Sequence, residues 1–191
     1  MIRKDSTLDD VAFAVAQALE AKGILSVLTG GSAAAIYAPN RYMSDDADFI
    51  LDNDESLDDV AAALEPIGFK RDGKSRIFHH SDSRYTVDFP KGPLAAGGEY
   101  VKATETLVQG GRRLRILTRF DCVRDRLAHF YYWSDYTALN AAVAVAADLS
   151  EADVARVRSW TERESSNLTE KFGEFARRLQ KAREEKKERP R

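Results

Sequence analysis

The chain has 191 residues, 43% hydrophobic and 31% charged, so it can bury one core, with or without a helical appendage. Its 29 basic and 31 acidic side chains give a net charge of −2, which argues against a protein that holds nucleic acid by bulk electrostatics. The single cysteine, Cys122, excludes an internal disulfide and a cysteine metal cluster. No stretch reaches the length of an apolar membrane span and the first residues lack a signal-peptide pattern, so we expect a cytoplasmic protein without a membrane partner.

Helical and strand patterns alternate in the first 117 residues, and helical patterns follow. Capping signals at Thr7 and Ser56 each open a predicted helix, and Gly23 and Pro66 are typical stops. Helices are predicted over 7–22, 32–37 and 56–65, and strands over 24–28, 44–51, 76–80, 84–89, 104–108 and 112–117. Further helices are predicted to begin at 118, 134 and 150, and a separate last helix carries an apolar stripe over 168–179.

Gly30-Gly31-Ser32 joins the first predicted strand to a short helical pattern. Free backbone N–H groups and the positive end of a helix dipole favour an anion at such a place. The sequence therefore indicates a turn that a phosphate group can approach, although the same residues also fit an ordinary turn.

Two aspartates, Asp46 and Asp48, lie in the strand predicted over 44–51. Because side chains alternate between the faces of a strand, both carboxylates point one way while the apolar residues beside them point into a core. Paired carboxylates repel each other unless a cation lies between them or one holds a proton. A solvated acidic surface is the alternative, since acidic residues continue at Asp52, Asp54 and Glu55.

The spacing of these motifs resembles the nucleotidyltransferase superfamily of the DNA-polymerase-beta type: Gly31-Ser32, thirteen residues, then Asp46-x-Asp48 on a strand. A longer string is most similar to minimal bacterial members, which include the AbiEii/MenT-like toxins of toxin–antitoxin systems: Gly30-Gly31, Tyr37, Arg41-Tyr42, Ser44, Asp46 and Asp48. The resemblance covers residues 22–90. It implies a third carboxylate on a later strand, for which Asp88 is the fitting residue.

The resemblance implies a metal-dependent enzyme that moves a nucleoside monophosphate from an NTP to a hydroxyl group. Asp46, Asp48 and Asp88 are then both catalytic residues and ligands of Mg²⁺ or Mn²⁺, and Asp88 helps to deprotonate the attacking hydroxyl.

Candidate nucleotide-binding residues are Gly30, Gly31, Ser32, Arg41, Lys91 and Arg126. Among the basic ones we favour Arg41, which directly precedes the acidic strand, for phosphate. For Arg126 a surface or helix-pairing role is slightly favoured over phosphate binding.

These patterns predict an α+β fold with a mixed sheet flanked by helices. We expect a nucleotidyltransferase-like core over 1–117 and a helical region over 118–191 that packs on it. The residues after Gln180 are rich in Lys, Arg and Glu and are expected to fray into solvent.

The toxin branch suggests the 3′ end of a tRNA, or another RNA, as acceptor and a cognate antitoxin as protein partner. Two alternatives stay open. One is a binding module with the same fold and no catalysis. The other is an enzyme that modifies a small molecule, as antibiotic-modifying relatives do, with the helical region enclosing a pocket.

Other conspicuous residues have structural interpretations at this stage. His79 and His80 lack the partners of a zinc site, and Cys122 fits a small packing residue. The aromatic run 130–133 fits a helix end packed on the core better than a surface that stacks a base. The glycine-rich segment 90–98 is predicted to be an irregular loop at the mouth of the site.

Overall fold

A mixed seven-stranded sheet organises the first 117 residues of the computed structural model, which describes residues 2–52 and 55–188. Its strand order is β3-β4-β5-β2-β1-β9-β8. The strands are β1 (Ser26–Thr29), β2 (Asp46–Leu51), β3 (Lys70–Arg71), β4 (Ile77–His79), β5 (Thr86–Asp88), β8 (Thr104–Gln109) and β9 (Arg112–Leu117). Strand β1 pairs antiparallel with β2 and parallel with β9, and β2 pairs parallel with β5. The acidic strand β2 therefore lies inside the sheet, with a neighbour on each side.

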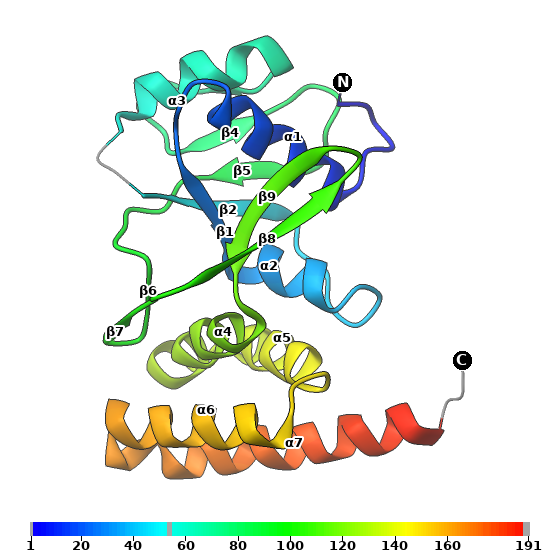
Figure 1. Ribbon diagram of the computed structural model, residues 1–191, viewed down its shortest axis with the longest axis vertical. Helices are drawn as coiled ribbons and strands as arrows, with labels where there is room; N and C mark the ends of the chain where they lie inside the picture. The colour runs from blue at the N-terminus through cyan, green and yellow to red at the C-terminus, as the bar shows by residue number, and fades with distance from the viewer. Residues whose placement is uncertain (1, 53–54, 189–191) are drawn as a thin grey trace.

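The helices form layers along the long axis of the molecule (Figure 1). Helices α1 (Leu8–Glu20) and α3 (Leu57–Leu64) lie at the sheet end, and α2 (Gly30–Tyr37) lies between the sheet and the next layer. That layer is the pair α4 (Arg119–Trp133) and α5 (Tyr136–Ala146), and the far layer is α6 (Glu151–Glu164) with α7 (Thr169–Glu188). The predicted α+β class is confirmed, while the division at residue 117 stays a prediction.

Side-chain capping fixes where most of these helices begin. Thr7 and Ser56 each form the predicted capping box. The hydroxyl accepts from the backbone N–H of the aspartate at the third helical position, and the carboxylate of that aspartate accepts from the backbone N–H of Thr7 or Ser56. The side chains of Thr118, Asp135 and Ser150 cap α4, α5 and α6. These local contacts explain why the sequence located the helices well.

The face of β2 opposite the aspartates is anchored in the main core. Ala47 and Phe49 are fully buried, and the ring of Phe49 stacks on Phe89 at 6.0 Å between centroids. Burying an aromatic side chain of this size contributes roughly 2–3 kcal/mol. The acidic face of β2 is thus held by packing behind it.

The segment 90–98 differs from the predicted irregular loop at the mouth of the site. Its second half forms a short hairpin of β6 (Ala95–Ala96) and β7 (Glu99–Tyr100). The N–H of Gly98 donates to both carboxylate oxygens of Glu164 on α6, at 2.9 and 3.0 Å. The prediction of an irregular loop was wrong for the second half of the segment, because Gly98 binds Glu164 in the helical layer. Local composition does not encode this contact.

Helix α7 also continues beyond the predicted fraying point and ends at Glu188. The guanidinium of Arg183 donates to the carbonyls of Ala146 and Leu149, at 3.2 and 2.6 Å, and pairs with Glu151. It therefore adds a donor to the carbonyl of Ala146, which also accepts from the N–H of Leu149, and supplies a donor to the carbonyl of Leu149 just after α5. Residues 189–191 of the basic run, like Asp54 of the acidic run, lie outside the described residues.

Replacing Arg183 by methionine is expected to destabilise the helical layer by about 1–2 kcal/mol, because the partly buried carbonyl of Leu149 loses the guanidinium donor and the ion pair with Glu151 is lost, while the apolar stem is kept. Arg177→Met is the matched control, since Arg177 donates only to Gly173 within its own helix. Urea unfolding of both variants measures the difference. If Arg183→Met and Arg177→Met are equally stable, the predicted fraying after Gln180 is correct.

Within the described ranges, no helix combines the length and the apolar character that crossing a bilayer requires.

Candidate active site

The three predicted aspartates lie on adjacent strands. In the parallel pairing of β2 with β5, Asp46 is opposite Thr86 and Asp48 is directly opposite Asp88. Residues in register on neighbouring strands share a face, and Asp46, Asp48 and Asp88 all alternate with fully buried neighbours. The structure therefore brings the three carboxylates to one face of the sheet.

Ser32 holds the glycine turn against the acidic strand. Its fully buried hydroxyl donates to the carbonyl of Thr29 at 2.8 Å and accepts from the N–H of Asp48 at 3.1 Å. The hydroxyl is thus engaged with the backbone. Any phosphate at this turn would meet the N–H groups of Gly30 and Gly31 at the start of α2 rather than the Ser32 side chain.

The lack of a side chain at both glycines lets neighbouring side chains lie close to the backbone of the turn. Gly30 has a φ of +65°, and a Cβ built there would lie 2.2 Å from Oδ2 of Asp48. A Cβ on Gly31 would lie 3.1 Å from the hydroxyl of Ser44 and 3.2 Å from that of Tyr42. The loop after α2 therefore closes over the turn from the other side. Ser44 also donates to Oδ1 of Asp46 at 2.8 Å and orients that carboxylate.

Asp48 is electrostatically the most perturbed of the three carboxylates. Burial, and then the charge of Asp46, raise the pKa of Asp48 to about 7, with Asp88 adding to the shift and Arg126 opposing it. Without a cation, the site therefore retains a proton at neutral pH. Such a shift is typical of carboxylates gathered for function.

Asp88 has an incomplete set of partners. Its side chain is 13% exposed, and the Nε of Arg76 lies 3.0 Å from Oδ1. The alignment is not that of a hydrogen bond, so Oδ1 has no hydrogen-bond partner among the described residues. Burial raises the pKa of Asp88, Arg76 lowers it, and the charge of Asp46 raises it further. No pattern in the sequence points to Arg76, which lies twelve residues before Asp88 and reaches it through the β4–β5 pairing.

The carboxylate set fits a divalent cation in its chemistry. Three oxygen-donor side chains, one with a buried oxygen that lacks a hydrogen bond, form the donor set that Mg²⁺ or Mn²⁺ prefers. Across residues 2–52 and 55–188, no three His, Cys, Asp or Glu side chains are close enough to form an assembled metal site. The carboxylates would therefore have to draw together around an ion.

Replacing Asp48 by asparagine is expected to stabilise the metal-free protein at high pH only. Because the pKa of Asp48 is raised on folding from 3.8 to about 7, the folded chain binds more protons than the unfolded chain between these values. Stability is then lost as the pH rises through this window. Urea unfolding in EDTA should show the variant more stable than the wild type by roughly 4 kcal/mol at pH 8 and similar at pH 4. If the difference in stability between the two proteins does not vary with pH, the pKa of Asp48 is not raised by burial and by the charge of Asp46.

Arg126 is the one of the three basic candidates from the sequence whose charge acts on the carboxylates. It is buried on α4, its guanidinium pairs with Asp125 at 2.8 Å, and its charge acts on both Asp48 and Tyr42. The sequence slightly favours a surface or helix-pairing role for Arg126. The structure corrects the surface interpretation, because α4 packs beneath α2 with this side chain turned inward.

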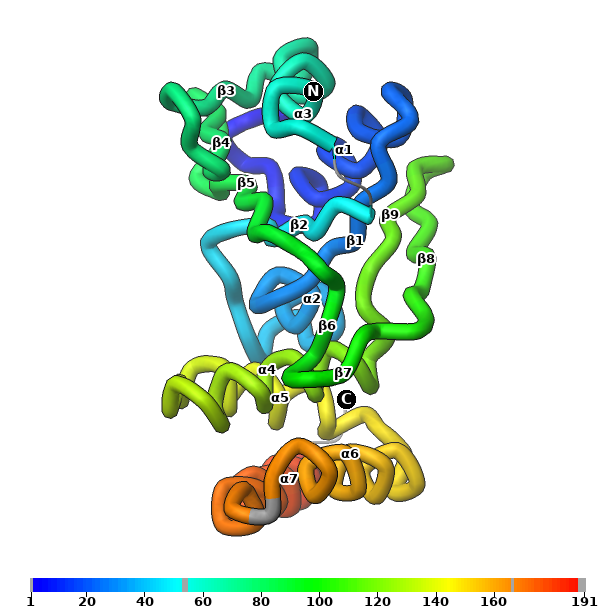
Figure 2. Tube along the Cα trace, turned by 90° about the vertical axis from the view of Figure 1, so that its left-hand side faces the viewer, coloured from blue at the N-terminus to red at the C-terminus, as the bar shows by residue number. Residues whose placement is uncertain are grey.

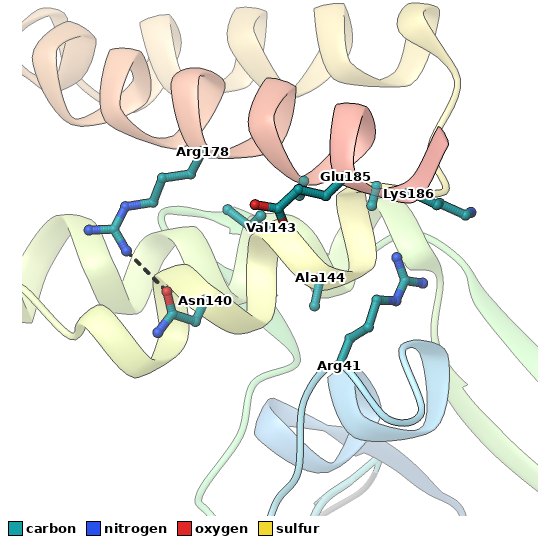
Figure 3. Close-up of a pocket in the computed structure, with 9 residues that line it drawn as sticks. Arg41, Asn140, Val143, Ala144, Arg178, Glu185 and Lys186 are labelled. Atoms are coloured by element: carbon teal, nitrogen blue, oxygen red, sulfur yellow. Dashed lines mark hydrogen bonds between the residues drawn. The ribbon is translucent and has the colours of Figure 1, made fainter. Parts of the chain in front are cut away.

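Arg41, our preferred phosphate ligand, is engaged elsewhere. It pairs with Asp148 after α5 and lines a pocket of about 430 Å³ between α5 and α7, together with Arg178 and Lys186 (Figure 3). Adjacency in sequence to the acidic strand misled the prediction, because the loop 38–45 turns this side chain toward the helical layers. As the structure stands, Arg41 is not a member of the carboxylate cluster.

Lys91 likewise does not lie among the carboxylates. It is exposed beyond the end of β5 and lines an open groove of about 920 Å³ with Arg76, Leu51 and Phe89. Neither Arg41 nor Lys91 is among the charges that shift the pKa of Asp48 or Asp88. The groove touches the cluster only through Arg76, which pairs with Asp88.

The remaining conspicuous residues are structural. The ring of His80 packs on Phe69, and its Nδ1 accepts from the N–H of Asp82 at 3.0 Å. Cys122 is fully buried, and burial raises the pKa of its thiol, so it is a packing residue and not a nucleophile.

Comparison with known proteins identifies the fold. No family model matches the sequence, and no curated protein matches it either. A crystal structure of an antigenic nucleotidyltransferase-like protein from Paracoccidioides brasiliensis superposes with a TM-score of 0.64 and 16% identity, covering 94% of this chain and 95% of the other. The solution structure of the antibiotic-resistance factor ANT(2'')-Ia superposes with a TM-score of 0.54 and 14% identity, covering 87% of this chain and 98% of the other. Both likenesses extend over nearly the whole of the compared chains.

Proposed function

Because the chain has the fold of the nucleotidyltransferase superfamily, we propose that it transfers a nucleoside monophosphate from an NTP to a hydroxyl group of an acceptor. The observation that carries this proposal is the register of β2 and β5, which brings Asp48 and Asp88 side by side and next to Asp46. A solvated acidic surface would not raise the pKa of Asp48 to about 7.

In the proposed reaction, a hydroxyl oxygen of the acceptor forms a bond to the α-phosphorus of the NTP. The bond from that phosphorus to the oxygen bridging the α- and β-phosphates breaks, and pyrophosphate leaves with that oxygen. Asp88 accepts the hydroxyl proton, since its buried oxygen lacks a hydrogen bond. A divalent ion held by the three aspartates would neutralise charge on the phosphate oxygens.

The other residues of the site position the nucleotide. The N–H groups of Gly30 and Gly31 face the phosphates at the start of α2, and the lack of side chains allows the approach. Arg126 supplies positive charge from below, already oriented by its pair with Asp125. Ser44 orients Asp46 and does not itself contact the nucleotide.

Two acceptor classes follow from different observations. The resemblance of the Gly30–Asp48 motif to the toxin branch favours the 3′ end of a tRNA or another RNA, with an antitoxin as partner. The likeness in fold to an antibiotic-resistance factor favours a small-molecule acceptor as the second candidate.

A transfer assay tests the proposal directly. The protein is incubated with each α-³²P-labelled NTP, Mg²⁺ or Mn²⁺, and either total tRNA or a panel of aminoglycosides. We expect label to appear in one acceptor class and pyrophosphate to be released in equal amount. Absence of transfer, together with absence of metal-dependent NTP binding in calorimetry, would instead support a module that has the fold without the activity.

A further inference from the structure

The aromatic run at the end of α4 divides into two buried and two exposed residues. Phe130 and Tyr131 are 1% and 4% exposed and belong to the core. Tyr132 and Trp133 are 51% and 69% exposed. Most of the Trp133 indole is thus open to solvent, and Trp is a side chain that stacks well on flat rings.

Trp133 lies on the face of α4 that leads to the carboxylates. Its ring packs against His129, one turn earlier, at 4.9 Å between centroids. Arg126 lies one further turn back and shares this face, because residues three and four apart are neighbours on a helix. The charges of Arg126 and Asp125 act on His129, and the charge of Arg126 also acts on Asp48. The stripe Arg126–His129–Trp133 therefore continues the candidate active site toward the helix end.

Tyr132 faces another way. Its hydroxyl donates to Glu164 on α6 at 2.7 Å, and its ring meets Trp133 only edge-on, at 6.1 Å. Of the two exposed aromatic residues of the run, only Trp133 therefore belongs to the stripe that begins at Arg126.

The dimensions of the stripe suit one nucleotide. Arg126 and Trp133 are seven residues apart, which corresponds to about 10 Å along a helix. A ribose and its base bridge such a length when the phosphates lie near Arg126. Helices α4 and α5 lie beneath α2 and the loop that follows it (Figure 2), and both helices contact α2, which begins at the glycine turn.

We propose that Trp133 stacks the base of the bound NTP, and that His129 holds the indole in place. The inference rests on the proposed function and specifies how the nucleoside is positioned. Because every base presents a π-face, stacking by Trp133 gives broad acceptance of NTPs, with purines bound most tightly.

Binding measurements with and without the base test this assignment. Calorimetry with Mg²⁺ compares ATP with inorganic tripolyphosphate, which lacks ribose and base, for the wild type and for Trp133→Ala. We expect the variant to bind ATP about tenfold more weakly and tripolyphosphate with unchanged affinity. Tyr100→Ala is the matched control, since Tyr100 on β7 is 70% exposed and should leave both affinities unchanged. Trp133→Phe, which keeps a flat ring, should recover most of the ATP affinity.

Tryptophan fluorescence gives an independent readout, because Trp133 and Trp160 are the two tryptophans of the chain and Trp160 is 1% exposed. ATP should quench the exposed indole in the wild type, and the quenching should disappear in Trp133→Phe while Trp160 still emits.

The outcomes separate this inference from the proposed function. Transfer activity with equal ATP affinity in wild type and Trp133→Ala overturns the stacking role and leaves the proposed function standing. The stacking role is also overturned if Trp133→Ala raises only the KM of the acceptor. Trp133 would then contact the acceptor and not the base of the NTP. A wild type that binds neither ATP nor tripolyphosphate overturns both.

Discussion

Replacing Asp46 by alanine is expected to lower nucleotidyl transfer by about 10²- to 10³-fold or more, because the variant loses one of the three carboxylates that would hold the divalent ion against the reacting phosphates. The fold should survive, since Asp46 is partly exposed and its carboxylate accepts a hydrogen bond from the nearby Ser44. Thermal unfolding in EDTA checks the fold, and incorporation of labelled nucleotide checks the activity.

Asp45→Ala is the matched control for this prediction. Asp45 is the same residue type, one position earlier, and is exposed; its backbone carbonyl accepts from Thr86, a bond that the substitution keeps. Its removal should change transfer by less than about twofold. If both variants lose activity equally, the acidic surface as a whole acts on the substrate and the specific role of Asp46 is refuted.

Replacing Gly30 by alanine is expected to remove activity even where the protein still folds. The new methyl group would lie 2.2 Å from Oδ2 and 2.9 Å from Cγ of Asp48, so the carboxylate must rotate away from its neighbours. The backbone also has a φ of +65°, which costs a residue with a Cβ about 1–2 kcal/mol. We expect at least a hundredfold loss of transfer and a destabilisation of about 3 kcal/mol, of which the part beyond backbone strain reflects the contact with Asp48.

Gly110→Ala separates the two contributions. Gly110, in the β8–β9 turn, has a φ of +56°, and a Cβ there would meet nothing within 4 Å. This variant should carry the backbone cost alone and retain full activity. Urea unfolding and the transfer assay on both variants measure the difference. Full activity in Gly30→Ala would show that the turn tolerates a side chain and is not a close approach to a ligand.

The local elements followed from the sequence because their causes are local. The capping boxes at Thr7 and Ser56 satisfy backbone groups within four residues of themselves. The period of two in β2 assigns Asp46 and Asp48 to one face and Phe49 to the other, whatever lies around them. The two aspartates and the glycine turn were therefore predictable as a motif.

The assembly of the site was decided by the tertiary structure. Whether Asp88 reaches Asp48 depends on a parallel pairing between strands almost forty residues apart, and a slip of one residue would turn Asp88 to the opposite face. The choice between Arg41 and Arg126 also depended on packing. Arg41 is close in sequence but points to Asp148, whereas Arg126 comes from a helix nearly eighty residues after Asp48 and lies beneath the turn.

The same distinction explains the wrong predictions at the surface. Composition indicated a loose loop at 90–98, which is rich in glycine, and a frayed end after Gln180, which has little apolar content. Each is ordered by a contact with another layer, Gly98 with Glu164 and Arg183 with the carbonyls at and just after the end of α5. The sequence by itself determined the long strands, most helix starts and which face of β2 carries the charge, while the short strands β3, β6 and β7 were not predicted. Only the tertiary structure decided which charges meet, because long-range pairing and packing set distances that no local pattern contains.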